Sequence, residues 1–144
     1  MKNVLIGIGL LTAGLLLSCE QTAITTDPVN VTTTTARHET AKVGNDVTVS
    51  INDIKDSRCP SNANCIWYGN ATVSVTLAKG TEQAKATLCL GACSQNGGIK
   101  DNDVTTVKLG GATYQVTLSE VKPYPVAPEP ENTYKEAVIT VRQQ

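Results

Sequence analysis

The segment ATVSVTL, residues 71–77, shows the fold class most clearly, because apolar and hydroxyl-bearing side chains alternate along it. Successive side chains of a β-strand point to opposite faces, so this alternation predicts a strand with one buried face. No window shows the 3.6-residue period of an amphipathic helix. The same two-residue period recurs along the chain and predicts strands near 46–53, 70–78, 84–89, 104–109, 113–121 and 134–142.

Glycines separate several of these segments and define the turns. Gly110 and Gly111 stand between two alternating segments, which is a signal for a tight hairpin, and Gly80 similarly follows Leu77. Six or seven short strands without intervening helices predict an all-β, antiparallel domain. We expect an immunoglobulin-like β-sandwich, with a small open β-barrel as the alternative. The Thr32–Thr35 run is compatible with either a linker or a first strand.

The first residues have the three-part organisation of a secretory signal peptide. A short positive region is followed by the apolar run Val4–Leu17, which is shorter than the roughly 20 residues that a transmembrane helix needs. Leu16, Ser18 and Cys19 then resemble the lipobox of bacterial lipoproteins. In such lipoproteins the signal peptide is cleaved before the cysteine, which receives acyl chains, so the resemblance implies a lipid anchor on Cys19.

This interpretation divides the chain into three parts. Residues 1–18 would be the signal peptide, residues 19–30 the lipidated cysteine and a polar tether, and residues 31–144 a single β domain. The protein would lie in the cell envelope, on the periplasmic or outer face of a membrane that it contacts through the lipid on Cys19. Loss of Lys2 with the signal leaves a net charge of about −2, and the absence of a basic patch argues against a nucleic-acid partner.

The chain has five cysteines, and four remain when Cys19 is set aside. An even number of cysteines in an exported domain predicts two disulfides. We favour local pairing, Cys59–Cys65 and Cys89–Cys93, although crossed pairing is possible if the two segments are neighbours. The second pair requires a turn between its cysteines, which Gly91 permits. A zinc site built from the four cysteines is disfavoured, because their spacing fits zinc knuckles poorly.

The stretch DSRCPSNANCIWYG, residues 56–69, combines a cysteine loop, a charged pair and the only tryptophan. We expect Asp56 and Arg58 to pair at the base of the loop. One interpretation is an exposed recognition loop that presents Arg58, Trp67 and Tyr68. We favour the other interpretation, a stapled loop with Trp67 in the core, because the chain has no phenylalanine and few other large side chains. On this interpretation Arg58 would lie on the loop surface.

The pattern D-S-R-C-P, four residues, then C-x-W-x-G and a valine-rich strand resembles a family of uncharacterised bacterial secreted proteins and lipoproteins. The likeness extends over most of residues 45–141 and includes Pro123-Tyr124-Pro125 and a closing Tyr134–Val141 strand. The resemblance implies a fold, and it implies no catalytic residues because the family has no established activity. The Cys89–Cys93 pair is less typical of that pattern.

Four of the six prolines lie within residues 122–132. Proline cannot donate the N–H that a central strand requires, so this segment is expected to be an extended surface loop.

The sequence gives little support for catalysis or metal binding. His38 is the only histidine, and a Ser–His–Asp or Cys–His site would have to use it. Residues 101–103 are better interpreted as a solvated acidic turn than as a Ca²⁺ site. No cofactor or metal is expected.

We therefore expect a non-enzymatic envelope protein that binds a protein or glycan, or that helps to build the cell surface. The alternative is an inhibitor of a secreted hydrolase that inserts the Cys59–Cys65 loop into the active site, since rigid loops lower the cost of ordering. A third hypothesis is an enzyme that uses carboxylates or thiols.

Overall fold

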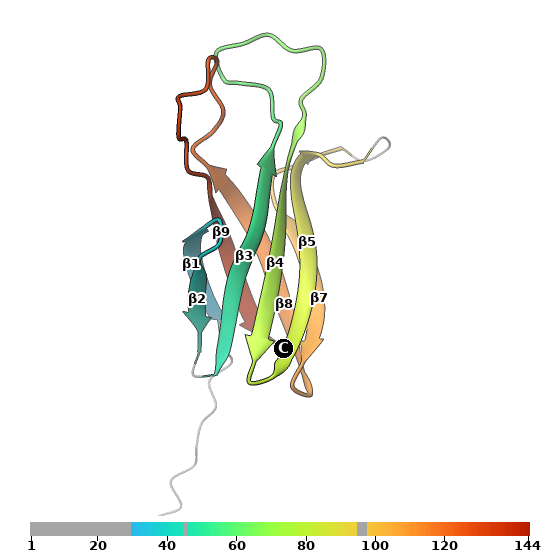
Figure 1. The fold of residues 1–144 in the computed structure, drawn as a ribbon. Coiled ribbons are helices and arrows are strands. Elements are labelled where there is room, and N and C mark those ends of the chain that lie inside the picture. Colours follow the sequence, from blue (N-terminus) through green and yellow to red (C-terminus); the bar gives the residue numbers. More distant parts are fainter. Residues whose placement is uncertain (1–29, 45, 95–97) are drawn as a thin grey trace, which may run out of the picture.

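The computed structural model describes residues 30–44, 46–94 and 98–144, which form two antiparallel sheets packed face to face (Figure 1). The predicted β-sandwich is confirmed, and the strands form two separate sheets rather than one closed barrel. One sheet has the order β1 (Asn30–Ala36), β9 (Glu136–Gln143), β8 (Ala112–Lys122) and β7 (Asp103–Leu109). The other has the order β2 (Thr40–Val43), β3 (Val47–Asp56), β4 (Asn70–Lys79), β5 (Glu82–Ala92) and β6 (Ile99–Lys100).

The strand order is simpler than that of an immunoglobulin domain. Within each sheet most strands pair with their neighbours in sequence, and the chain changes sheet only between β1 and β2 and between β6 and β7. Immunoglobulin domains instead interleave their two sheets in a Greek key. The likeness to the immunoglobulin fold therefore concerns the two-sheet architecture.

All six predicted strands are present, with boundaries that differ by a few residues. The hairpins at Gly80 and at Gly110-Gly111 are confirmed, because Lys79 pairs with Glu82 and Leu109 with Ala112. Three further strands, β1, β2 and β6, were not among the six, and the ambiguous Thr32–Thr35 run belongs to β1. The predicted signal peptide, Cys19 and nearly all of the tether lie outside the described residues.

The core consists mainly of valine, leucine and isoleucine from alternate positions of the strands, as the alternation predicts. Its single large aromatic side chain is Tyr114, which is 1% exposed. The large side chain of the core is therefore Tyr114.

A bulge in each sheet changes which side chains face inward. The register of β3 shifts between Ile51 and Asp53, so Ile51 and Ile54 both face the core although they are three residues apart. The register of β8 shifts in the same way between Leu118 and Glu120. After the bulge β3 continues to Asp56, beyond its predicted end, and the Asp56 side chain is 2% exposed.

The two ends of the sandwich differ. Asn30 pairs with Arg142, so the chain enters β1 at the end that also carries the short turns at Gly80 and Gly110. The opposite end carries two long loops, residues 57–69 between β3 and β4 and residues 123–135 between β8 and β9 (Figure 1). Within the described residues, no helix is long and apolar enough to cross a membrane.

Candidate functional site

The loop of residues 57–69 begins as a continuation of the β3–β4 hairpin. The backbone N–H of Ser57 donates to the carbonyl of Asn70 at 2.8 Å, and that of Cys59 donates to the carbonyl of Tyr68 at 2.8 Å. Gly69 has φ +67°, and a Cβ at this position would collide with the Ser57 carbonyl. The predicted Cys59–Cys65 disulfide is confirmed and closes the loop.

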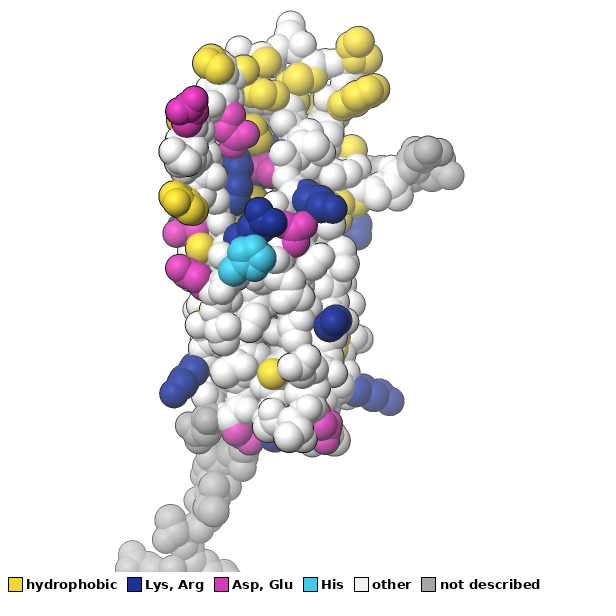
Figure 2. All heavy atoms as spheres, in the orientation of Figure 1, with side chains coloured by type: hydrophobic (Ala, Val, Ile, Leu, Met, Phe, Trp, Pro, Cys, Tyr) yellow, Lys and Arg dark blue, Asp and Glu magenta, His cyan; other side chains and the backbone are white. Residues whose placement is uncertain are grey.

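Three consecutive apolar side chains stand exposed on this loop. Ile66 is 102% exposed, Trp67 76% and Tyr68 67%. The prediction that Trp67 lies in the core is wrong. The backbone bonds that extend the β3–β4 ladder carry this segment beyond the end of the two sheets, where no core lies beneath it. Figure 2 shows hydrophobic side chains gathered at this end of the molecule.

Arg58 lies under the loop rather than on its surface. Its side chain is 10% exposed, and its Nε and Nη2 donate to the two carboxylate oxygens of Asp56 at 2.8 and 2.7 Å. Nη2 also donates to the carbonyl of Val121 at 2.7 Å, and the guanidinium lies 4.3 Å from the ring centre of Tyr124. The predicted pair with Asp56 is confirmed, but Arg58 is not presented for recognition.

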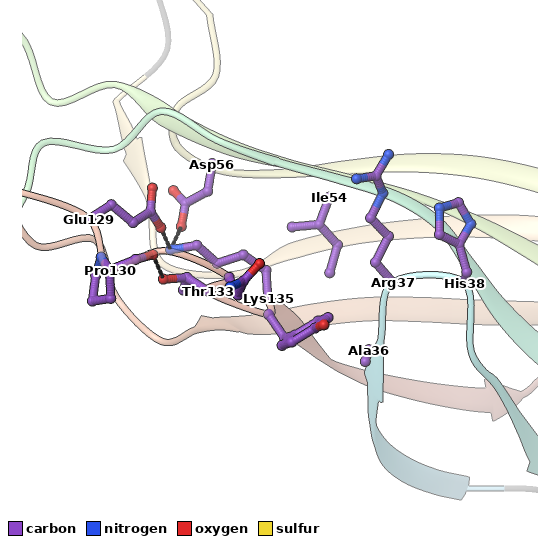
Figure 3. Close-up of a pocket in the computed structure, with 11 residues that line it drawn as sticks. Ala36, Arg37, His38, Ile54, Asp56, Glu129, Pro130, Thr133 and Lys135 are labelled. Atoms are coloured by element: carbon purple, nitrogen blue, oxygen red, sulfur yellow. Dashed lines mark hydrogen bonds and ion pairs between the residues drawn. The ribbon is translucent and has the colours of Figure 1, made fainter.

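Lys135 joins this pair from the other long loop. Its Nζ lies 3.4 Å from Asp56 Oδ2 and 3.0 Å from Glu129 Oε1 (Figure 3), and it donates to the carbonyl of Pro123 at 3.0 Å. We call Asp56, Arg58 and Lys135 the base cluster. Burial alone would raise the pKa of Asp56, but the hydrogen bonds and charge of Arg58, with a smaller contribution from Lys135, hold it below 3.8.

The two long loops also pair with each other above the base cluster. The backbone N–H of Ser61 donates to the carbonyl of Pro125 at 2.9 Å. The side chain of Asn62 donates to the carbonyl of Ala127 and accepts from its N–H, both at 2.8 Å. The predicted proline-rich surface loop is confirmed, and its exposed Tyr124 and Val126 extend the apolar surface. We call the exposed apolar set the apolar tip: Ile66, Trp67, Tyr68, Tyr124 and Val126.

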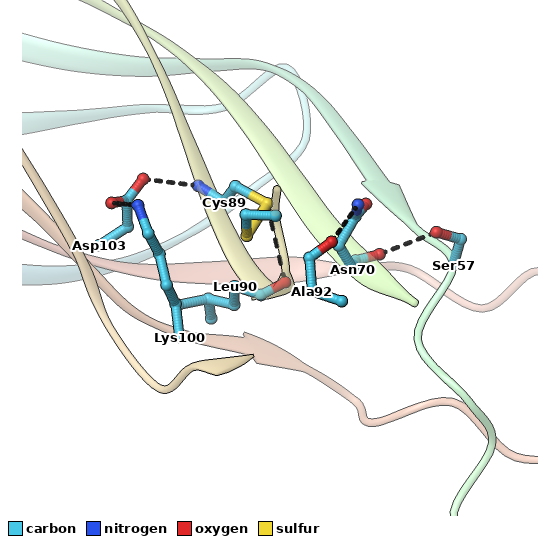
Figure 4. The surroundings of a disulfide bond; sticks show 8 residues. Ser57, Asn70, Cys89, Leu90, Ala92, Lys100 and Asp103 are labelled. Atoms are coloured by element: carbon cyan, nitrogen blue, oxygen red, sulfur yellow. Dashed lines mark hydrogen bonds and ion pairs between the residues drawn. A yellow bond between two sulfur atoms is a disulfide. The ribbon is translucent and has the colours of Figure 1, made fainter. Parts of the chain in front are cut away.

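The second predicted disulfide, Cys89–Cys93, is also confirmed and lies at the end of β5. Figure 4 shows the Asp103 carboxylate accepting from the Cys89 N–H at 2.9 Å and from Lys100 Nζ at 2.7 Å. Burial would raise the pKa of Asp103, but these bonds and the charge of Lys100 lower it. The Ala92 N–H donates to the carbonyl of Gly69 at 2.9 Å, which ties the end of the 57–69 loop to β5.

The structure tests the two metal sites considered from the sequence, a zinc site at the four cysteines and a Ca²⁺ site at residues 101–103. All four cysteines of the domain are bonded in pairs, so their sulfurs are not available as zinc thiolates. Asp103 is bonded to the β5 backbone and to Lys100, which leaves residues 101–103 without a converging set of oxygen ligands. Within the part of the chain that the structure describes, no three His, Cys, Asp or Glu side chains converge as a metal site requires.

A cleft of about 640 Å³ lies on the flank, between the β1–β2 turn and the second long loop. Its lining includes His38, whose backbone N–H donates to the carbonyl of Ile51 at 2.7 Å, and the carboxylates of Asp56 and Glu129. Two carboxylates in a cleft could suggest a hydrolase. However, the Asp56 side chain is only 2% exposed and accepts hydrogen bonds from Arg58, so its oxygens serve the base cluster and are not free to act on a substrate.

Comparisons with protein-family models, with curated proteins and with solved structures found no match.

Proposed function

We propose that this protein is a non-enzymatic, lipid-anchored component of the cell envelope that binds a protein partner through the apolar tip. The observation that carries the proposal is the run of three exposed apolar side chains, Ile66, Trp67 and Tyr68, on a loop that the scaffold holds in place. A large aromatic side chain has about 150–250 Å² of surface. The three aromatic side chains of the tip are between half and three-quarters exposed, so together they expose on the order of 400 Å². Apolar patches of that size on a monomer are often functional.

The rigidity of the tip supports a role in binding. The Cys59–Cys65 disulfide, the paired bonds between Asn62 and Ala127 and the bonds of Arg58 fix the loop before any partner arrives. Little conformational entropy would then be lost on association. Tryptophan and tyrosine are also enriched among the residues that dominate the binding energy of protein interfaces.

The position of the tip fits a lipid anchor on Cys19. An anchor at this cysteine reaches the domain through Asn30, which lies at the end of the sandwich opposite to the long loops. The tip then points away from the anchoring membrane, toward partners in the surrounding envelope or on the outside.

Crosslinking in an envelope extract tests the proposal. A double variant, Ile66→Ser with Trp67→Ser, should lose the proteins that the unmodified chain captures. Val104→Ser is the matched control, because Val104 is an apolar side chain, 47% exposed on β7, that lies outside the tip. Capture of the same proteins by the double variant would refute binding through the tip.

Inhibition of a secreted hydrolase is a second candidate, favoured by the projection of the clamped 57–69 loop beyond the sheets. An inhibitor of this kind should block its target at a stoichiometric ratio, and Ile66→Ser should weaken the inhibition. Cleavage of the loop without any inhibition would exclude this role.

A further inference from the structure

The flank cleft is separate from the apolar tip and has the dimensions of a ligand site. It lies between the turn that joins β1 to β2 and residues 129–135, and its volume of about 640 Å³ falls within the range of about 300–1,000 Å³ that is usual for small-molecule pockets. Its lining includes Arg37, His38 and Tyr134.

The charges around the cleft are already neutralised within the protein. Arg37 Nε lies 3.0 Å from Asp53 Oδ1, and Lys135 is held by Asp56 and Glu129. A charged ligand would have to compete with these internal partners, and it would find no unbalanced charge of either sign among them. The electrostatics therefore favour a neutral ligand over an ion.

The lining combines apolar and polar side chains. Ile54, which is 8% exposed, and Ala36 supply apolar surface, and Tyr134 is 82% exposed. Asn132 and Thr133 supply polar groups, and the Thr133 hydroxyl donates to the carbonyl of Pro130 at 2.7 Å. A sugar ring matches this combination, because one face of the ring presents apolar C–H groups and its edge carries hydroxyls that can both donate and accept hydrogen bonds.

We propose that this cleft binds a neutral saccharide unit, with the ring of Tyr134 stacked on the sugar face and Asn132 and His38 available to its hydroxyls. An aromatic face supplies contact area, and a few polar groups fix the orientation of the ligand. The site would give the envelope protein a contact with glycan that is independent of the protein partner at the tip.

The test is a titration of the ¹⁵N-labelled full chain in a detergent without a sugar headgroup, followed by NMR. The probes are three neutral disaccharides: chitobiose, cellobiose and maltose. At least one should produce saturable shifts confined to residues 36–38, 54 and 129–135. Tyr134→Ala should weaken this binding by about tenfold, the size of one lost aromatic contact. Tyr68→Ala is the matched control, because Tyr68 is a similarly exposed tyrosine on the tip, and it should leave the affinity unchanged.

Three results would overturn the proposal. The first is the absence of saturable shifts with all three disaccharides in the millimolar range. The second is tighter binding of inorganic phosphate than of any sugar at the same residues, which would indicate an anion site. The third is loss of sugar binding in Tyr68→Ala with retention in Tyr134→Ala, which would move the saccharide to the tip. Because none of these readouts uses the protein partner, failure of the tip proposal would leave this test intact.

Discussion

Replacement of Arg58 by alanine should destabilise the protein strongly, although the residue lies in a loop. The substitution removes the side-chain donors at 2.8 and 2.7 Å from Asp56. This carboxylate, which is 2% exposed, keeps only the backbone N–H of residue 58 at 3.3 Å and Lys135 Nζ at 3.4 Å. It also removes the donor to the carbonyl of Val121. Breaking a buried ion pair by deleting one partner costs about 3–5 kcal/mol, and we expect a loss of that size in the free energy of unfolding. The total free energy of unfolding of a small domain is about 5–15 kcal/mol, so this loss would be a large part of it.

The assay is urea denaturation at neutral pH followed by far-UV circular dichroism, with the disulfides intact. Arg58→Lys should recover only part of the loss, because an ammonium keeps the charge but cannot form the two-pronged contact with Asp56. Trp67→Ala provides the contrast. With the Trp67 side chain 76% exposed, its removal should change the free energy of unfolding by less than about 0.5 kcal/mol.

The opposite ranking would refute this reasoning. A cost below about 0.5 kcal/mol for Arg58→Ala would mean that the base cluster does not hold the loops. A cost of about 3–5 kcal/mol for Trp67→Ala would place this side chain in the core after all. Fluorescence gives an independent check, since an exposed Trp67 should emit near the maximum of free indole in water and be quenched readily by acrylamide.

Two further predictions rest on the structure, and a third rests on the sequence around Cys19. The pKa values of Asp56 and Asp103 are lowered from 3.8, so both ionised carboxylates stabilise the fold fully above that pH. The free energy of unfolding should therefore fall as the pH drops below 3.8. A urea midpoint that stays constant across this range would contradict the lowered pKa values. Gly69→Ala should destabilise the protein more than Gly80→Ala. Both positions have positive φ, but only at Gly69 would the new Cβ meet backbone atoms. Equal urea midpoints for the two variants would argue against the close approach of Gly69 to the Ser57 backbone. Cys19→Ala should abolish incorporation of labelled palmitate and release or stall the protein, and persistent labelling in the membrane fraction would disprove the lipid anchor.

Local patterns were sufficient to predict most of the fold. The alternation in residues 71–77 depends only on the two-residue period of a strand, and the glycine turns at 80 and 110–111 depend only on backbone freedom, so neither requires knowledge of distant residues. The local disulfides were predicted for the same reason, since each pair is separated by few residues. The bulge at Asn52 was missed, because it interrupts the alternation on which strand prediction relies.

The candidate site depended on contacts that no local pattern contains. The pairing of Asp56 with Arg58 was visible in the sequence. The other two contacts come from distant segments, because Lys135 reaches Asp56 from the loop of residues 123–135, and the carbonyl that accepts from Arg58 belongs to Val121 on β8. No signal in the sequence connected Asn62 with Ala127, which lies 65 residues away.

The sequence by itself determined an all-β chain with two local disulfides and a loop stapled beside the only tryptophan. Only the tertiary structure decided that Trp67 is outside and Arg58 is inside. Composition suggested the reverse, since an apolar ring favours burial and a guanidinium favours water. The backbone hydrogen bonds that continue the β3–β4 pairing carry Trp67 past the end of the core. Asp56 and the carbonyl of Val121 accept hydrogen bonds from Arg58 and so offset the cost of burying its guanidinium. Burial is set by what surrounds a residue in space, and for this loop the surroundings come from strands and loops distant in the sequence.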